Sequence, residues 1–370
     1  MSARPRPQRH PSAVILFCLA GLVGIGVLMI YSSSAIYAER IYGSPYHFLQ
    51  RQILHLALGT ALLVFAAKHP YERYRRTYPI FVFLAFFFML LVLIPGVGTQ
   101  VGGARRWIRI FGIGFQPSEF VKFSLIIWMA GFLCRKKGEL HQFSKGLLPS
   151  LIVMGVFFFL LILQPDFGTA VLISLTLFIM IFVAGLRPSH MILSLSGLAG
   201  MGAMLVAFSP YRLLRFLTFL DPWADSRGSG YQLVQSFLAF GQGGIFGVDL
   251  GNSKQKLFFL PEAHTDFIFS ILAEETGFIG VLFVVFLIAL LSYKGLEVAL
   301  RCPDEFGRNL ALGITCLIGL QSLLNLGVVV GALPTKGIPL PFISYGGSSL
   351  LMNMFMVGVL VNVAEQKIDV

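Results

Sequence analysis

The sequence predicts an all-α polytopic membrane protein with about ten transmembrane helices. Of its 370 residues, 56% are hydrophobic and only 12% are charged, and the mean hydropathy is +0.81. A soluble protein carries charge on about a quarter of its residues, so this composition excludes a soluble domain of the same length. The apolar residues also form ten separate runs, each of about the 17–25 residues that a helix needs to cross a bilayer.

The ten apolar runs follow one another along the whole chain. They occupy residues 13–35, 48–67, 78–95, 118–134, 146–163, 168–186, 190–209, 267–292, 309–332 and 344–364. The first run is longer than the apolar part of a cleavable signal peptide, about 7–15 residues, so we expect it to be retained as a span. Only the gap at 210–266 is long enough to fold separately, and we therefore expect a single integral membrane domain over residues 1–370.

The Lys and Arg residues predict the orientation of these spans. The net charge is +11, and the basic residues lie in short clusters between apolar runs, such as 73–76 and 135–137. With the N-terminus inside, most of these clusters fall in cytoplasmic loops, as the positive-inside rule requires. We therefore expect both termini in the cytoplasm and the 210–266 loop, between the seventh and eighth helices, outside. Because the sequence has no continuous basic face, nucleic acid is not an expected partner.

The 210–266 loop contains two segments of distinct character. Leu233, Phe237 and Phe240 recur at helical spacing within residues 231–240. Such an amphipathic helix is typical of the membrane surface. The glycine-rich segment 241–247 follows and indicates irregular turns.

Asp266 ends this loop immediately before the eighth apolar run. A carboxylate where a polar loop meets a membrane is partly desolvated, which raises its pKa and suits it to act as a base near neutral pH. Alternatively, Thr265 or Asp266 only caps the helix that begins at Phe267, since both residue types are good N-caps. Glu262 and His264 lie beside Asp266, and three ionisable groups in five residues exceed what a cap needs.

Other ionisable residues lie within the predicted spans. Glu119 and Lys122 are three residues apart and either form an ion pair on one helix face or place Lys122 where it binds an anionic group of a ligand. Glu274 lies about 80° from Asp266 around an ideal helix. Glu274 and Glu275 therefore either line the same cavity as Asp266 or pair with a basic residue of another span.

Three arginines precede the fourth span, beside a tryptophan. Arg105, Arg106 and Arg109 either anchor the chain at the membrane interface or form a site for pyrophosphate or a lipid headgroup together with Lys254 and Lys256.

Several other residues have plainer interpretations. Asp166 and Asp221 adjoin prolines and are expected in turns, whereas Asp249 is a loop acid without an evident partner. Cys18, Cys134, Cys302 and Cys316 have no paired spacing, so neither a disulfide framework nor a metal site is supported. The sequence contains no P-loop, no dinucleotide fingerprint, no His-Glu-x-x-His motif and no serine nucleophile elbow.

Six motifs, taken together and in order, carry a resemblance to a known family. They are Phe115-Gln-Pro-Ser-Glu-Phe-Val-Lys122, Gln164-Pro-Asp-Phe-Gly-Thr169, Asp221-Pro222 with Gly230-Tyr-Gln232, Gly251-Asn-Ser-Lys-Gln-Lys256, Leu260-Pro-Glu-Ala-His-Thr-Asp-Phe-Ile-Phe269 and Pro339-Leu-Pro-Phe-Ile-Ser-Tyr-Gly-Gly347. The set spans nearly the whole chain and strongly resembles the SEDS family (shape, elongation, division and sporulation). The residues of the fourth and fifth motifs are more similar to those of the division and sporulation branch than to those of the elongation branch. Asp249 stands where the family usually has a small residue such as Gly.

The resemblance implies a ten-span peptidoglycan glycosyltransferase that polymerises lipid II onto a nascent glycan chain. It further implies an outward-facing site in the cytoplasmic membrane, a septal location during cell division, and a class B penicillin-binding protein and other division proteins as partners. The family's essential aspartate falls on Asp266, and its motif Glu and Lys fall on Glu119 and Lys122. His264 and the five loop cations are then candidate substrate-binding residues. No cofactor is required with certainty, although a divalent cation such as Mg²⁺ or Mn²⁺ would help a pyrophosphate to leave.

Two rival interpretations predict different sensitivities to mutation. A flippase or transporter of the lipid-linked precursor would depend on charges spread across the membrane and would tolerate loss of Asp266. A non-catalytic division scaffold would depend on apolar contact surfaces and on no charge in a pocket.

Overall fold

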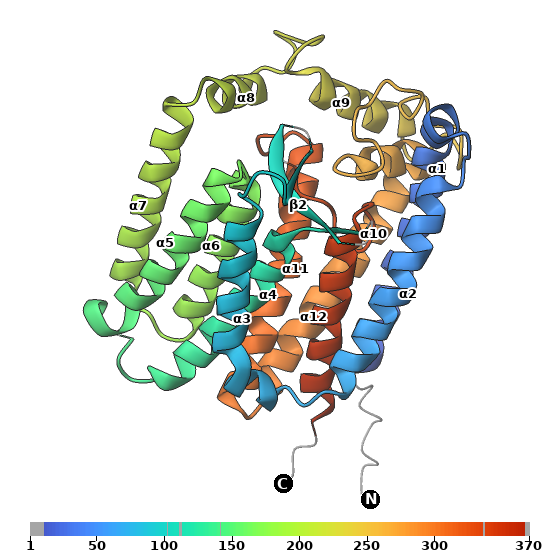
Figure 1. Ribbon diagram of the computed structural model, residues 1–370. Helices are drawn as coiled ribbons and strands as arrows, with labels where there is room; N and C mark the ends of the chain where they lie inside the picture. The colour runs from blue at the N-terminus through green and yellow to red at the C-terminus, as the bar shows by residue number, and fades with distance from the viewer. Residues whose placement is uncertain (1–10, 102, 111–112, 141, 336, 367–370) are drawn as a thin grey trace, which may run out of the picture.

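The computed structural model describes residues 11–101, 103–110, 113–140, 142–335 and 337–366, so both extreme ends and Lys336 lie outside it. It is a bundle of apolar helices, as the composition predicts (Figure 1). In the described residues, eight helices are long and apolar enough to cross a membrane. The helices are α1 (Pro11–Tyr42), α2 (His47–Lys68), α3 (Glu72–Leu91), α4 (Pro117–Arg135), the π-helical turn η1 (Phe143–Leu147), α5 (Leu148–Leu163), α6 (Phe167–Val183), α7 (Pro188–Ala207), α8 (Pro210–Leu220), α9 (Tyr231–Gly243), α10 (Ile268–Arg301), α11 (Glu305–Val329) and α12 (Gly347–Glu365).

Each of the ten predicted runs contains a helix. Three spans differ most from their predicted boundaries, because α1 continues to Tyr42 instead of 35, α3 begins at Glu72 instead of 78 and α10 continues to Arg301 instead of 292. In α10, Glu297 forms ion pairs with Lys294 and Arg301 at 2.7 and 2.6 Å, so these charged residues extend the helix instead of ending it. Pairs at i,i+3 and i,i+4 stabilise a helix in this way.

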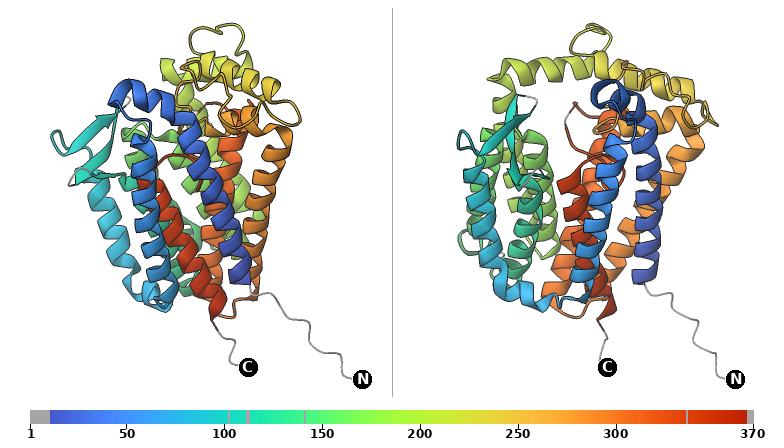
Figure 2. Two further views of the ribbon diagram at one scale, coloured as in Figure 1. Left: turned by 90° about the vertical axis from the view of Figure 1, so that its right-hand side faces the viewer. Right: turned by 45° about the vertical axis from the view of Figure 1, so that its right-hand side comes forward.

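The 210–266 loop lies at one end of the bundle, and the described ends of α1 and α12 lie at the other (Figure 1). This arrangement agrees with an even number of crossings. The predicted amphipathic helix is confirmed as α9, and α8 precedes it, which we did not predict. Both helices lie across the end of the bundle, roughly at right angles to the spans (Figure 2), as surface helices do.

A small sheet precedes α4, where the sequence predicted only a loop. Its antiparallel strands are β1 (Gly98–Val101), β2 (Ala104–Ile110) and β3 (Ile113–Phe115), in the order β1-β2-β3. The chain can reverse between β1 and β2 because Gly103 adopts φ +81°, which glycine tolerates. The fold is therefore all-α in its membrane part, with one β element that holds the three arginines.

The centre of the bundle is α4, whose side chains are buried almost all round against α3, α6, α11 and α12. Two of those buried side chains, Glu119 and Lys122, are charged. A helix buried on every side inside a membrane bundle needs partners for any charge it holds.

Candidate active site

Asp266 lies in the last turn of the 210–266 loop, outside α10. The helix begins at Ile268 with Phe267 as its N-cap residue, and no side chain caps it. Thr265 is occupied elsewhere, since its hydroxyl donates to the Glu262 carboxylate at 2.6 Å. The capping interpretation is therefore wrong, and the structure leaves the Asp266 carboxyl free for another task.

Two other parts of the chain hold the backbone around Asp266. Asn325 of α11 donates through Nδ2 to the Asp266 carbonyl at 2.9 Å and to the Ile338 carbonyl at 2.8 Å. Gly337 is so close that an added Cβ would lie 3.1 Å from Oδ2 of Asp266. Asp266 is therefore held where the loop, α11 and the segment 337–341 meet.

The surroundings of Asp266 raise the pKa of its carboxyl to about 7. Burial is the main cause, because it disfavours the charged form, and the negative charge of Glu262 adds to it. The positive charges of Arg106 and Arg215 act in the opposite direction without cancelling the rise. The carboxyl is thus half ionised near neutral pH, which is what a general base requires.

Of the three arginines on β2, Arg106 is the one that points into the protein. Its Nε donates to the Gln164 carbonyl at 2.8 Å, and its Nη2 donates to the Pro165 carbonyl. Arg105 and Arg109 are exposed. The sheet therefore places one guanidinium near Asp266 and leaves the other two on the surface.

The two aspartates that we expected in turns are found there. Asp166 accepts a hydrogen bond from the Thr169 N–H at 3.3 Å and caps α6. Asp221 accepts from the Trp223 and Ala224 N–H groups at 3.1 and 3.2 Å. Both interpretations are confirmed.

Glu119 and Lys122 form a buried ion pair at 2.6 Å. Lys122 Nζ also donates to Gln321 Oε1 at 2.9 Å, and Gln321 Nε2 donates to the Pro339 carbonyl at 2.9 Å. The pair is thus linked to the segment 337–341 by hydrogen bonds through Gln321 of α11. The ion pair of Lys122 with Glu119 agrees with the ion-pair interpretation.

Sequence reasoning missed Gln321 and Asn325. They are four residues apart and therefore on one face of α11, and both are 2% exposed or less. Two amides on one face of an apolar span were the available signal, because a buried amide is costly unless it is hydrogen-bonded.

Glu274 and Glu275 do not line a cavity with Asp266. Glu275 pairs with Lys256 at 2.8 Å, and Glu274 accepts hydrogen bonds from loop residues that include the Lys254 N–H at 2.9 Å. The helical-wheel argument failed because Asp266 precedes the helix. Lys256 is buried and paired with Glu275, whereas the Lys254 side chain is exposed.

His264 lies in a cluster of aromatic rings. Its ring centroid is 4.7 Å from that of Phe48, 5.7 Å from Tyr37 and 5.9 Å from Tyr345. Burial lowers the pKa of the imidazole, because it disfavours the charged form. Its carbonyl accepts from the Tyr345 N–H at 3.0 Å, which joins this side of the Asp266 loop to the segment before α12.

No metal site made by the protein alone is found in the described part of the chain. No group of three or more His, Cys, Asp or Glu residues there could hold a metal ion. Mg²⁺ is commonly held by one or two carboxylates together with substrate phosphates, so its binding does not require such a group.

Known proteins resemble the chain over nearly its whole length. The protein "Probable peptidoglycan glycosyltransferase FtsW" of Coxiella burnetii is 45% identical over 358 residues, 96% of each chain. "Stage V sporulation protein E" of Bacillus subtilis is 41% identical over 97% of this chain and 98% of its own.

Solved structures show the same fold. A chain of a peptidoglycan synthase complex, studied for the coordination of polymerization and crosslinking, superposes with a TM-score of 0.79 at 31% identity, covering 95% of this chain and 96% of its own. The rod shape determining protein RodA of Thermus thermophilus gives a TM-score of 0.72 at 27% identity, covering 98% and 100%. The model of the FtsW/RodA/SpoVE family, described as "Cell cycle protein", matches residues 12–368, and the chain, a multi-pass membrane protein, belongs to that family.

Proposed function

We propose that this protein is a peptidoglycan glycosyltransferase that polymerises lipid II into glycan strands at the outer face of the cytoplasmic membrane. The observation that carries the proposal is Asp266, whose carboxyl is partly buried, free of capping duty and has a pKa of about 7. Relatives more than 40% identical carry the name peptidoglycan glycosyltransferase, which supports the same activity here.

The reaction begins with proton transfer to Asp266. The carboxylate accepts the proton of the GlcNAc 4-hydroxyl on an incoming lipid II, and that oxygen forms a bond to the anomeric carbon of the terminal MurNAc of the growing chain. The bond from this carbon to the pyrophosphate oxygen breaks, and undecaprenyl pyrophosphate leaves with the electron pair. A single displacement of this kind inverts the configuration at the anomeric carbon.

The negative charge that develops on the pyrophosphate needs cations nearby. Arg106 is the first candidate, because its charge already acts on Asp266. Arg105, Arg109 and Lys254 have exposed side chains and are the remaining candidates from the predicted set. A divalent cation bound to the pyrophosphate would add to this stabilisation, and loss of activity in EDTA with recovery on adding Mg²⁺ or Mn²⁺ would identify it.

We infer the partner and the cellular location of this protein from its relatives. The similarity to a chain of a peptidoglycan synthase complex supports a class B penicillin-binding protein as the crosslinking partner. The family's description as a cell cycle protein and a relative named for sporulation support a septal location with other divisome proteins. We place the 210–266 loop and Asp266 outside, because the predicted positive-inside arrangement puts the opposite end of the bundle in the cytoplasm.

A flippase for the lipid-linked precursor is less well supported. Among the described residues, Glu119 and Glu275 are buried in the spans and pair with Lys122 and Lys256, and the buried Glu274 is hydrogen-bonded to the loop. A transport path needs ionisable groups that are open to the moving substrate. The group that remains open is Asp266, at one end of the bundle.

The test is polymerisation of labelled lipid II by purified protein, alone and with a cognate class B penicillin-binding protein. Wild type should make glycan chains, whereas folded Asp266→Asn and Asp266→Ala should make none, because the base is missing. Asp249→Asn is the matched control, since Asp249 is an exposed acid in the same loop. Normal polymerisation by both Asp266 variants would refute the proposal and make lipid II translocation in sealed vesicles the next assay.

A further inference from the structure

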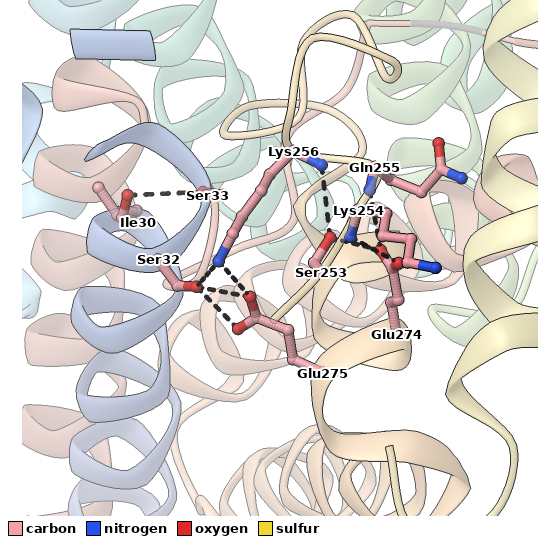
Figure 3. A network of polar contacts seen from close by, with 9 residues as sticks. All are labelled: Ile30, Ser32, Ser33, Ser253, Lys254, Gln255, Lys256, Glu274 and Glu275. Atoms are coloured by element: carbon pink, nitrogen blue, oxygen red, sulfur yellow. Dashed lines mark hydrogen bonds and ion pairs between the residues drawn. The ribbon is translucent and has the colours of Figure 1, made fainter. Parts of the chain in front are cut away.

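A buried polar cluster joins the 210–266 loop, α10 and α1 (Figure 3). Lys256 Nζ donates to Glu275 Oε1 at 2.8 Å, and the two side chains are only 4% and 0% exposed. Ser32 of α1 lies between them, because its Oγ is 2.7 and 2.8 Å from the two Glu275 oxygens and accepts from Lys256 Nζ at 3.1 Å. These three groups satisfy one another inside the protein.

The neighbouring Glu274 binds the same stretch of loop through its backbone. Its carboxylate accepts hydrogen bonds from the Lys254 N–H at 2.9 Å and the Gln255 N–H at 3.3 Å, and also from the Ser253 hydroxyl (Figure 3). Hydrogen bonds to an ionised acceptor are stronger than those between neutral groups. Ser32, Lys256, Glu274 and Glu275 are called the clasp below.

The helix α10 is broken directly after the clasp glutamates. Gly277 has φ 65° and ψ −166°, so the helix is interrupted just after the two glutamates. The N–H groups of Phe278 and Ile279, which the break frees, donate to the Gly244 and Ile245 carbonyls at 3.0 and 3.3 Å. The glycine-rich segment 241–247 therefore serves as a backbone cap for the second part of α10.

The clasp closes the piece of chain that carries Asp266. Lys256 and Glu275 are 19 residues apart, and Asp266 lies between them, ten residues after one and nine before the other. A closed loop has fewer conformations than an open one. The clasp therefore fixes both ends of the segment 256–275, which places the Asp266 carboxyl beside α11 and Gly337.

We propose that the four clasp residues are positioning residues that hold Asp266 in its reactive place, and that Lys256 does not bind substrate phosphate. The inference rests on the proposed polymerase function. Its physical basis is that misplacing a reacting group by about 1 Å can cost roughly a hundredfold in rate, whereas substrate affinity depends on groups elsewhere in the site.

The test is a double-mutant cycle on the buried pair. Lys256→Met leaves the Glu275 charge buried without its cation, and Glu275→Gln leaves the Lys256 charge buried without its anion. Removing one member of a buried pair is far more disruptive than removing both. We therefore expect each single variant to lose at least about tenfold in kcat with KM changed by less than about twofold, and the double variant to recover most of the loss.

Two further variants sharpen the cycle. Ser32→Ala removes only the hydroxyl and should lower kcat by about two- to fivefold, so it remains informative where a charge variant does not fold. Lys254→Met is the contrast, because Lys254 is an exposed candidate phosphate ligand and its loss should raise KM. A rise in KM for Lys256→Met that Glu275→Gln does not reverse would show that Lys256 binds substrate and would overturn the inference.

Hydrogen–deuterium exchange gives a readout that does not depend on activity. Peptides covering residues 257–267 should exchange faster in Lys256→Met and Ser32→Ala than in wild type, and return to wild-type rates in the double variant. Unchanged exchange in both of these variants would overturn the inference. If wild type makes no glycan but the exchange pattern appears, the clasp stands and the proposed function fails.

Discussion

Asp266→Asn is expected to abolish polymerisation while making the folded protein more stable above neutral pH. The environment that gives Asp266 a pKa of about 7 disfavours its ionised form. One pKa unit corresponds to about 1.4 kcal/mol, so the rise from 3.8 to about 7 corresponds to roughly 4 kcal/mol. Because the side chain is partly accessible, solvent screening makes this figure an upper bound.

The pH dependence has a definite sign. Between about pH 4 and 7 the unfolded carboxyl is ionised while the folded one keeps its proton, so wild type loses stability as pH rises through this window. Above about pH 7 both states are ionised and the loss is complete. Asn carries no charge, so the stability advantage of Asp266→Asn should be small near pH 4 and reach its full value by about pH 8.

The assay is thermal unfolding of both proteins in the same detergent at pH 4.5, 6 and 8, alongside the polymerisation assay. Asp249→Asn serves as the control, since Asp249 is exposed and its variant should show no comparable trend. An Asp266→Asn protein that is less stable than wild type at pH 8, or whose stability difference does not change with pH, would refute the reasoning.

Three further predictions follow from the same region. The kcat/KM of wild-type polymerisation should rise about tenfold from pH 5 to 6 and level off above pH 7–8, and a flat profile over pH 5–8 would contradict a base with a pKa of about 7. Gly337→Ala should lower kcat by about tenfold, because its Cβ would lie 3.1 Å from Oδ2 of Asp266 and would displace the carboxyl. Gly346→Ala is the control and should have little effect, since its Cβ would meet only Ser349 at 3.6 Å. Equal rates for the two variants would show that the added methyl group at 337 does not displace Asp266. Asp249→Gly should stabilise the fold by about 0.5–1 kcal/mol in thermal unfolding, because Asp249 adopts φ +74°, and a loss of stability would show that the side chain has a partner.

The φ of +74° at Asp249 explains why the family usually has a small residue at this position. A left-handed conformation costs an ordinary residue about 1 kcal/mol or more, and glycine least. The turn that ends in Gly251, itself at φ +88°, therefore favours a small residue at 249. Aspartate is tolerated there because its short polar side chain visits this conformation more readily than most.

The spans were predictable because they depend on local composition. A run of about 20 apolar residues has to be a helix in a membrane, where each backbone polar group must be satisfied within its own segment. The position of Asp266 just before α10 was also predictable, since the polar loop and the apolar run adjoin in the chain. The same local reasoning identified α9, Asp166 and Asp221.

The polar contacts that the sequence did not reveal join residues far apart in the chain. Lys256 was predicted as a candidate phosphate ligand, and in the structure its Nζ contacts Glu275 and Ser32 instead. Gln321 went unnoticed because its partners, Lys122 and Pro339, lie on other segments.

The sequence by itself determined a helical protein with many membrane spans and a carboxylate where a polar loop meets a span, because hydropathy and charge can be read from each residue of the chain. Only the tertiary structure decided which charges are free and which are paired. A buried charge is stable only with a partner at hydrogen-bond distance, and the packing of α1, α10 and the loop supplies one to Lys256 but none, among the described residues, to the carboxyl of Asp266.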